Sequence, residues 1–196
     1  MPVRPISRAG LVDLITEAIR PEHGNVAIDG PPPTRPDELA DAVAGRLRER
    51  GRQALHVRSG DFLRPASLRF ELGRTNPDAY YERWVDLAAL GREALNRSGR
   101  ALPTFWNPVT DRATRAPYVP ADLVIVSGDL LLGAGLDLDL TIHLGMNLAA
   151  LARRLPPELT WTLPAHERYK TEVDPASFAD KVVRMNDPEH PALLEP

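Results

Sequence analysis

A short apolar run, Asn25–Asp29, is followed at once by a glycine, three prolines and, a few residues later, an amphipathic stretch that ends at Gly51. A buried strand, a turn and a helix in this order form the phosphate-binding loop whose pattern is G-x-x-x-x-G-K-[ST]. In such a loop backbone N–H groups and the helix N-terminus converge on phosphate, a lysine adds positive charge, and a hydroxyl holds magnesium. The chemistry to examine first is therefore nucleotide binding and phosphoryl transfer.

The residue types inside this turn depart from that pattern. Counting from Gly30, the glycine, lysine and threonine positions fall on Arg35, Pro36 and Asp37. Asp37 places a carboxylate at the start of the helix, where it suits an empty helix dipole but repels a phosphate. Prolines lack an N–H group and fix φ near about −65°, so they remove donors and close positive-φ conformations. The turn contains Pro31, Pro32, Pro33 and Pro36.

Two interpretations of the turn remain open. In the first, it is a rigid proline turn in which Thr34 or Arg35 caps a structural helix. In the second, Arg35 replaces the lysine as the phosphate partner. The predicted cofactor-binding residues are Gly30, Thr34 and Arg35. No cofactor is expected under the first interpretation, whereas ATP and magnesium are expected under the second.

The elements that must position this turn alternate along the chain. Apolar runs predict strands at Asn25–Asp29, Gln53–Ser59, Leu102–Trp106, Asp122–Gly128, Leu136–Gly145 and Lys181–Met185. Helical spacing predicts helices within residues 1–24 and at Asp37–Gly51, Ala79–Arg97, Asn147–Leu155 and Ala165–Val173. Such alternation requires crossover connections and a mostly parallel sheet. We expect one domain over residues 1–196, with a surface-bound or loose tail at 186–196.

Beyond the first loop, a series of phrases follows the order and spacing of one known family. They are GDFLRP (Gly60–Pro65), LGRTNPDAYYERWVDL (Leu72–Leu87), WNPVTD (Trp106–Asp111), VIVSGDLLL (Val124–Leu132), RYKTEVDP (Arg168–Pro175) and ADKVVRMNDPEHP (Ala179–Pro191). With these phrases the chain resembles the uridine kinase family of P-loop nucleoside kinases, of the phosphoribulokinase/uridine kinase type, from about Asn25 to about Pro191. The resemblance implies a three-layer α/β P-loop kinase fold, with a mostly parallel sheet flanked by helices.

The resemblance also implies where the chemistry would lie, and the chain differs at those positions. In the family, an acidic residue after the second strand lies near the reacting hydroxyl of the nucleoside. Here Gly60 occupies that position and Asp61 follows it. The strand-end acidic residue that helps to organise magnesium is replaced by Ser127. Because the core pattern stays apolar while these positions change, we interpret the chain as a kinase fold that has abandoned ATP chemistry.

Other candidate residues lie on loops after strands, where α/β sheets usually bind ligands. Asp61 is the predicted catalytic residue, since a strand-end carboxylate could bind a sugar hydroxyl; the alternative is a turn-forming aspartate. Arg153 falls in a predicted shortened lid at about residues 150–170. For each arginine the alternative is a solvated position or a structural ion pair. The predicted substrate-binding residues are Arg64, Arg74, Tyr81, Trp106, Arg153 and Arg168, and Asp29 also survives as a candidate.

Composition narrows the classes of function. The apolar fraction of 43%, the net charge of −3 and the absence of cysteine predict a globular protein without disulfides, with the cytoplasm as the expected compartment. That charge argues against nucleic acid as a partner. No apolar run approaches the roughly 20 residues of a membrane helix, and no signal peptide is visible. The five histidines lack metal-binding spacing, so we predict no metal site.

The sequence therefore favours a catalytically impaired uridine kinase-like protein. Such a pseudokinase would bind a nucleoside-like or phosphorylated small molecule, or a protein partner, which includes a second copy of itself. The alternative is an active ATP-dependent kinase for uridine, cytidine or a related metabolite, with Arg35 in the role of the lysine and Asp37 or Asp61 as the metal ligand. A third hypothesis, an enzyme of another class that reuses the substrate pocket, has no distinct catalytic set in the sequence.

Overall fold

A seven-stranded sheet forms the centre of the molecule, in the order β1-β11-β10-β9-β2-β8-β3. The computed structural model describes residues 3–102, 106–107, 110–113 and 117–195. The five strands from β10 to β3 run parallel, and β11 and β1 are antiparallel additions at one edge, so the predicted mostly parallel sheet is confirmed. The strands are β1 Val3–Pro5, β2 Asn25–Asp29, β3 Ala54–Arg58, β8 Leu123–Gly128, β9 Leu140–Gly145, β10 Lys181–Arg184 and β11 Ala192–Leu194.

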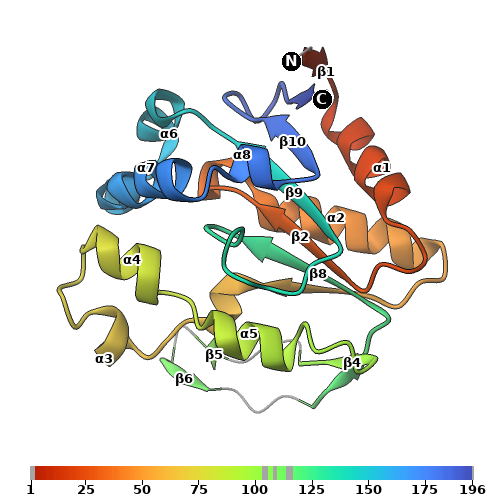
Figure 1. The fold of residues 1–196 in the computed structure, drawn as a ribbon, viewed down its shortest axis with the longest axis horizontal. Helices are drawn as coiled ribbons and strands as arrows, with labels where there is room; N and C mark the ends of the chain where they lie inside the picture. Colours follow the sequence, from red (N-terminus) through yellow and green to blue (C-terminus); the bar gives the residue numbers. More distant parts are fainter. Residues whose placement is uncertain (1–2, 103–105, 108–109, 114–116, 196) are drawn as a thin grey trace.

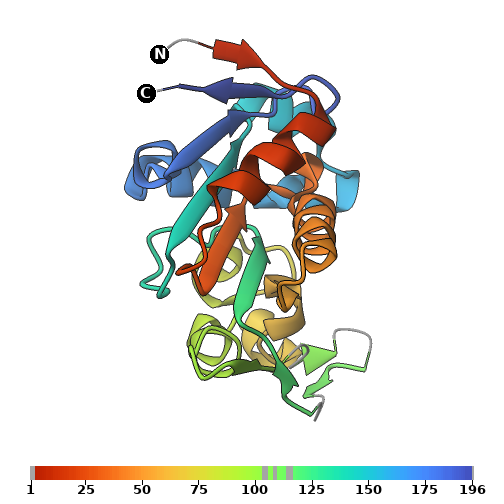
Figure 2. The same cartoon turned by 90° about the vertical axis from the view of Figure 1, so that its right-hand side faces the viewer.

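Helices cover both faces of this sheet and give the predicted three layers (Figures 1 and 2). Helices α1 (Arg8–Ala18) and α2 (Pro36–Glu49) pack on one face, while α5 (Leu87–Glu93) and α7 (Leu163–Glu172) pack on the other. None of the helices in the described ranges combines the length and apolar character that a membrane crossing needs. The remaining helices are α3 Ala66–Arg69, α4 Pro77–Arg83, α6 Leu148–Arg154 and α8 Pro175–Phe178, with 3-10 turns η1 Pro32–Thr34, η2 Ser59–Phe62 and η3 Pro157–Thr162.

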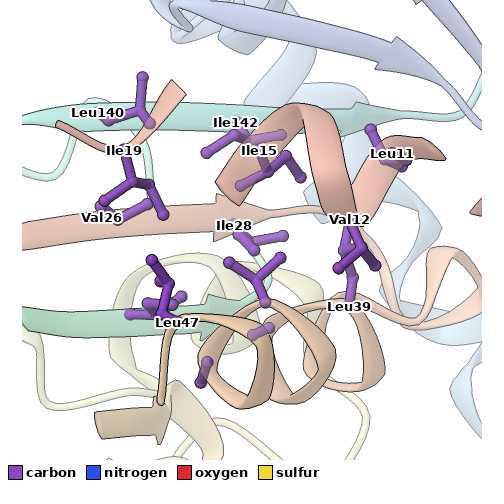
Figure 3. Packing of buried hydrophobic residues seen from close by; sticks show 14 of the residues in the cluster. Leu11, Val12, Ile15, Ile19, Val26, Ile28, Leu39, Leu47, Leu140 and Ile142 are labelled. Atoms are coloured by element: carbon purple, nitrogen blue, oxygen red, sulfur yellow. The ribbon is translucent and has the colours of Figure 1, made fainter. Parts of the chain in front are cut away.

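Strand β2 is buried along its whole length, and its side chains alternate between the two faces. Val26 and Ile28 contribute to the cluster under α1 and α2, whereas Ala27 belongs to the cluster on the other face. Figure 3 shows Leu11 and Ile15 of α1 packed over this part of the sheet. Successive side chains of a strand point to opposite faces, so β2 packs into the hydrophobic clusters on both faces of the sheet. This packing fixes the orientation of the strand. The turn after Asp29 therefore begins at a position in the middle of the sheet that the core holds rigidly.

Three predicted elements differ from the structure. The helix predicted at Ala79–Arg97 is two helices, α4 and α5, because Asp86 caps the second one and accepts the Ala89 N–H at 2.9 Å. The strand predicted at Leu136–Gly145 begins only at Leu140. The strand predicted at Leu102–Trp106 lies mostly outside the described residues. Nearby are two small hairpins, β4 Arg100–Ala101 with β7 Val119–Pro120, and β5 Trp106–Asn107 with β6 Arg112–Ala113.

The prediction of a surface-bound or loose tail is wrong for its second half. Strand β11 lies between β10 and β1, and Leu193 is only 6% exposed. The Ile6 N–H donates to the Pro191 carbonyl at 3.0 Å, which ties the two chain ends together. Figure 2 shows both termini side by side at one end of the sheet. The pairing joins residues at opposite ends of the sequence, so no local pattern indicates it.

Replacing Leu193 by alanine tests whether the last strand is part of the core. Loss of a buried leucine side chain costs about 2–4 kcal/mol, and urea denaturation of the full chain measures it. The matched control is Leu72→Ala, since Leu72 is 53% exposed, and it should cost less than about 0.5 kcal/mol. Equal effects of the two substitutions would show that the tail does not contribute to folding.

Candidate functional site

The segment from Gly30 to Asp37 forms a closed turn rather than an open phosphate cradle. Its four prolines have no N–H group. The N–H groups of Gly30, Thr34 and Arg35 donate to the carbonyl oxygens of Gly128, Pro31 and Pro32 at 2.9, 2.8 and 3.0 Å. Seven of these eight residues thus lack a donor or use it inside the protein. The geometry agrees with the first interpretation of the turn.

Close packing holds this turn against the sheet. A Cβ atom at Gly30 would lie 2.7 Å from Thr34 Oγ1 and 2.8 Å from Leu144 Cβ, so this position requires glycine. Thr34 is fully buried, and its hydroxyl donates to the Pro31 carbonyl at 2.8 Å. Arg35 occupies the N-cap position of α2 in the left-handed conformation, with φ of 56°. Neither side chain caps the helix, which corrects that detail of the prediction.

The Arg35 side chain is already neutralised by carboxylates. Its guanidinium lies 2.6 Å from Glu189 and 3.6 Å from Glu38. Arg8 of α1 donates to the Arg35 carbonyl at 3.3 Å and lies equally close to Glu38, which fastens the turn to the first helix. Arg35 therefore acts in a network of ion pairs, which does not favour the second interpretation.

A chain of polar side chains crosses from α2 to the sheet beside the turn. The Ser127 hydroxyl donates to Asp37 at 2.5 Å and lies 2.7 Å from His56 Nε2. His56 Nδ1 lies 2.6 Å from Asp41, whose pKa is lowered by His56 and Arg58 against the opposing effect of its own burial. Ser127 is fully buried, so this chain joins the start of α2 to the carboxyl end of β8.

Asp61, the predicted catalytic residue, lies in η2 next to this polar chain. Burial raises the pKa of its carboxyl group, and Arg58 partly opposes that effect. The preceding residues, Ser59 and Gly60, line two neighbouring cavities, but Asp61 is not among the lining residues in the described part of the chain. A catalytic role for Asp61 stays a prediction.

Two adjoining cavities lie at the carboxyl ends of β3 and β8. The first, of about 280 Å³, has aromatic walls from Tyr80, Tyr81 and Trp84. The second, of about 330 Å³, lies over the turn and is lined by Asp37 and Glu38, among others. Both include Ser59, Gly60 and Asp129 in their walls. We call the first the aromatic cavity.

Two of the predicted substrate-binding residues come together at the edge of the aromatic cavity. Tyr81 lines it, and Arg168 stacks over the Tyr81 ring at 4.4 Å. Arg168 also pairs with three carboxylates, Asp78, Glu82 and Glu172, at 3.2, 2.8 and 2.8 Å. Hydrogen bonds to Glu172 and Glu82 raise the pKa of its guanidinium. For Arg168 the geometry favours the alternative of a structural ion pair.

Arg64, Arg74 and Arg153 are not among the described residues that line this cavity. Arg64 has a buried Nε without a hydrogen-bond partner among the described residues. Arg74 stacks 5.2 Å from the Phe70 ring centroid. Arg153 lines a wide opening of about 500 Å³ that Arg35 also lines. Trp106 lies on β5 opposite Ala113. The structure thus distributes the predicted set over several places.

A buried polar cluster under α7 was largely missed by the sequence analysis. Asp29 accepts the Leu131 N–H at 2.9 Å, lies 2.7 Å from His143 Nδ1 and accepts the Tyr169 hydroxyl at 3.2 Å. Asp129, on the adjacent strand end, accepts the Tyr80 hydroxyl at 3.0 Å. The parallel register of β2 and β9 places His143 beside Asp29. The one signal that could have indicated this cluster was that both residues lie near the ends of predicted strands that could pair.

Burial controls the charge of this cluster. It raises the pKa of Asp129 well above the ordinary value of an aspartate, and the nearby Asp29 raises it further. Burial also lowers the pKa of His166 to about 4, although Asp29 opposes the shift. His166 Nε2 lies 3.5 Å from Asp129 Oδ2. Both shifts favour the uncharged form of the adjacent Asp129 and His166 side chains.

Comparison with solved structures identifies the fold. A possible uridine kinase from Bacillus stearothermophilus superposes with a TM-score of 0.71 at 19% identity, covering 87% of this chain and 96% of that one. A protein proposed to be a fructose transport system kinase, from Silicibacter sp. TM1040, gives 0.58 at 19% identity, with 87% and 91% covered. The YGR205w protein gives 0.54 at 10% identity, with 97% and 100% covered. No family model and no curated protein matches the chain.

At these identities the likeness is one of fold. The chain has the three-layer α/β P-loop kinase fold of uridine kinase-like structures, as its sequence phrases predict. The side chains described above are this chain's own, and their chemistry has to be judged from its own geometry.

The buried His166 makes stability depend on pH. Its pKa of about 4 in the folded chain lies below the ordinary 6.5, so its contribution is complete above pH 6.5 and is lost as pH falls toward 4. The stability of wild type minus that of His166→Gln should therefore fall by up to about 3 kcal/mol between pH 7 and pH 4, measured by urea denaturation. The raised pKa of Asp129 acts with the opposite sign but is common to both proteins.

His190→Gln is the matched control, since the His190 side chain is 84% exposed. A difference between wild type and His166→Gln that stays constant over this pH range would contradict the assignment.

Proposed function

We propose that this chain is a kinase-fold binding protein that holds a nucleoside-like molecule and does not transfer phosphate from ATP. The observation that carries the proposal is the closed turn between Gly30 and Asp37, whose remaining N–H groups mostly donate inside the protein. A P-loop binds a triphosphate through such groups, and phosphoryl transfer relies almost wholly on positioning and positive charge.

The electrostatics of the second cavity support this proposal. Asp37, Glu38 and Asp129 contribute to its walls, and the cation Arg35 is paired with Glu38 and Glu189. Asp37, in the place of the magnesium-binding hydroxyl, accepts a hydrogen bond from Ser127, in the place of the carboxylate. A triphosphate in this cavity would face carboxylates without a lysine, which is unfavourable in a partly buried site.

The aromatic cavity supplies the place for the ligand. Tyr80, Tyr81 and Trp84 offer flat apolar faces, and Glu82 and Asp129 offer polar groups for hydroxyls. A flat base with a sugar matches such a lining, because ligand sites are mostly apolar with a few well-placed polar groups. The acidic surroundings favour an uncharged nucleoside over its phosphate ester. The family resemblance agrees with this class of ligand, as does the likeness in fold to a possible uridine kinase.

One observation favours the alternative of an active kinase. Asp37 and Ser127 still place a carboxylate beside a hydroxyl, with the two positions exchanged relative to those that the resemblance implies around magnesium. If Arg35 left its carboxylate partners, it could approach a phosphate held there. This arrangement would make Arg35 essential for turnover.

The two functions differ in their response to ATP with magnesium. We expect no rise in the melting temperature of the full chain, whereas binding at a hundredfold over the dissociation constant would add about 2.7 kcal/mol of stability. An ADP-release assay with uridine and cytidine should show no turnover. Wild-type turnover that disappears in Arg35→Ala would overturn the proposal and establish the active kinase.

Uridine and cytidine test the aromatic cavity directly. Either nucleoside at saturating concentration should raise the melting temperature of wild type, and Tyr81→Ala should weaken the binding at least tenfold, because the aromatic wall is lost. Tyr118→Ala is the matched control, since Tyr118 is 40% exposed and is not among the described residues that line the cavity. Absence of binding, or equal effects of the two substitutions, would exclude the aromatic cavity as the site.

A further inference from the structure

A third cavity, of about 240 Å³, lies beneath helices α6, α7 and α8, at the carboxyl ends of β2 and β9. We call it the lower cavity. Apolar side chains form most of its wall, and they include Met146, Leu148, Leu151, Pro175, Val182 and Leu194. The polar part has an inner group, Asp29, Asp129, His143, His166 and Tyr169, and further polar side chains, Asn147, Lys170, Asp174, Arg184 and Asn186. An apolar wall with a few converging polar groups is the usual form of a small-molecule site.

Most of these polar groups are satisfied within the protein, but one is not. Asp29 receives hydrogen bonds from a backbone N–H and from Tyr169, whose hydroxyl in turn accepts the Leu132 N–H at 2.9 Å. The His166 side chain is only 6% exposed, and its Nε2 has no hydrogen-bond partner among the described residues. A buried polar atom without a partner opposes folding, because it has lost its hydrogen bonds to water. A ligand that supplies the missing partner would recover that free energy.

The charges in the lower cavity select the kind of ligand. Burial raises the pKa of Asp129 and lowers that of His166 to about 4, so both shifts favour the uncharged form of the two groups nearest the unsatisfied atom. An uncharged carboxyl group presents one donor and one acceptor, and an uncharged imidazole nitrogen presents one or the other. Asp29 and Asp174 in the same wall are matched by Lys170 and Arg184, so the wall has no clear excess of one charge that would attract an ion. At about 240 Å³ the lower cavity is smaller than the two adjoining cavities at β3 and β8, which favours a ligand of about one ring.

We propose that the lower cavity binds a small uncharged ring compound with a hydrogen-bond donor and acceptor side by side, such as a cyclic amide. His166 Nε2 and the Asp129 carboxyl group bind its polar edge, and the apolar wall encloses its ring. This site is distinct from the aromatic cavity, although Asp129 lies between the two. The proposal does not rest on the nucleoside binding proposed above.

The probe is 2-pyridone, a single-ring cyclic amide, titrated into the full chain at pH 7 and followed by protein NMR. We expect saturable binding with shifts at the Leu131 and Leu132 amides, whose N–H groups belong to the polar cluster. N-methyl-2-pyridone, which lacks the donor, should bind at least tenfold more weakly, and benzoate, an anion of similar size, should not bind.

Ala176→Trp tests the position of the site. Ala176 lines the lower cavity and is exposed, so the larger ring fills the entrance without disturbing the core. It should weaken 2-pyridone binding at least tenfold, as should His166→Phe, which removes the unsatisfied nitrogen. Ser177→Trp is the matched control, because Ser177 is the next exposed residue of α8 and does not line the cavity.

Several outcomes would overturn this inference. They are an absence of saturable 2-pyridone binding, equal effects of Ala176→Trp and Ser177→Trp, and benzoate binding as strong as that of 2-pyridone. Tyr81→Ala should leave 2-pyridone binding unchanged, whereas it should weaken uridine binding. Failure of one site is thereby distinguished from failure of the other.

Discussion

The arrangement at the carboxyl edge of the sheet depends on one constraint. The turn after β2 uses most of its backbone N–H groups in hydrogen bonds within the protein. The rings of Pro31, Pro32, Pro33 and Pro36 remove donors, and the 3-10 turn η1 uses those of Thr34 and Arg35. With no phosphate held at the start of α2, Asp37 is free to complement the helix dipole and to accept a hydrogen bond from Ser127. In an open loop these backbone N–H groups would bind a nucleotide, whereas here they form hydrogen bonds within the protein.

The polar chain beside the turn runs from Asp37 through Ser127 and His56 to Asp41. A hydroxyl has one proton, and that of Ser127 goes to Asp37. His56 lies between Ser127 and Asp41, with Nε2 2.7 Å from the hydroxyl and Nδ1 2.6 Å from the carboxylate. Arg58 lies 3.1 Å from Asp41 and 3.7 Å from Asp37. The cations near this edge thus hold carboxylates of α2 against the sheet, where a P-loop protein would direct positive charge toward a ligand.

The sequence predicted the layers of this fold well because local patterns of apolar residues indicate its strands and helices. Apolar runs such as Asn25–Asp29 and Asp122–Gly128 could only be buried strands, and phrases like RYKTEVDP carried their order along the chain. The cap at Asp86 was visible in principle, since an aspartate before an apolar stretch often starts a helix. The site was less predictable. Asp29, Asp129 and His166 are distant in sequence, and only the folded chain brings them together. Burial there raises the pKa of Asp129 and lowers that of His166.

The two acids and the unsatisfied imidazole are the least stable part of an otherwise apolar interior. Removing ionisable groups from water opposes folding unless partners compensate, and apolar residues of similar size are often at least as stabilising in such places. Asp29 is compensated by its three neighbours, but His166 Nε2 is not compensated by any described residue. Strongly shifted groups that converge on a cavity are more typical of binding sites than of structural cores. In this chain such groups converge under α7, which agrees with the proposal that this cavity binds a small molecule.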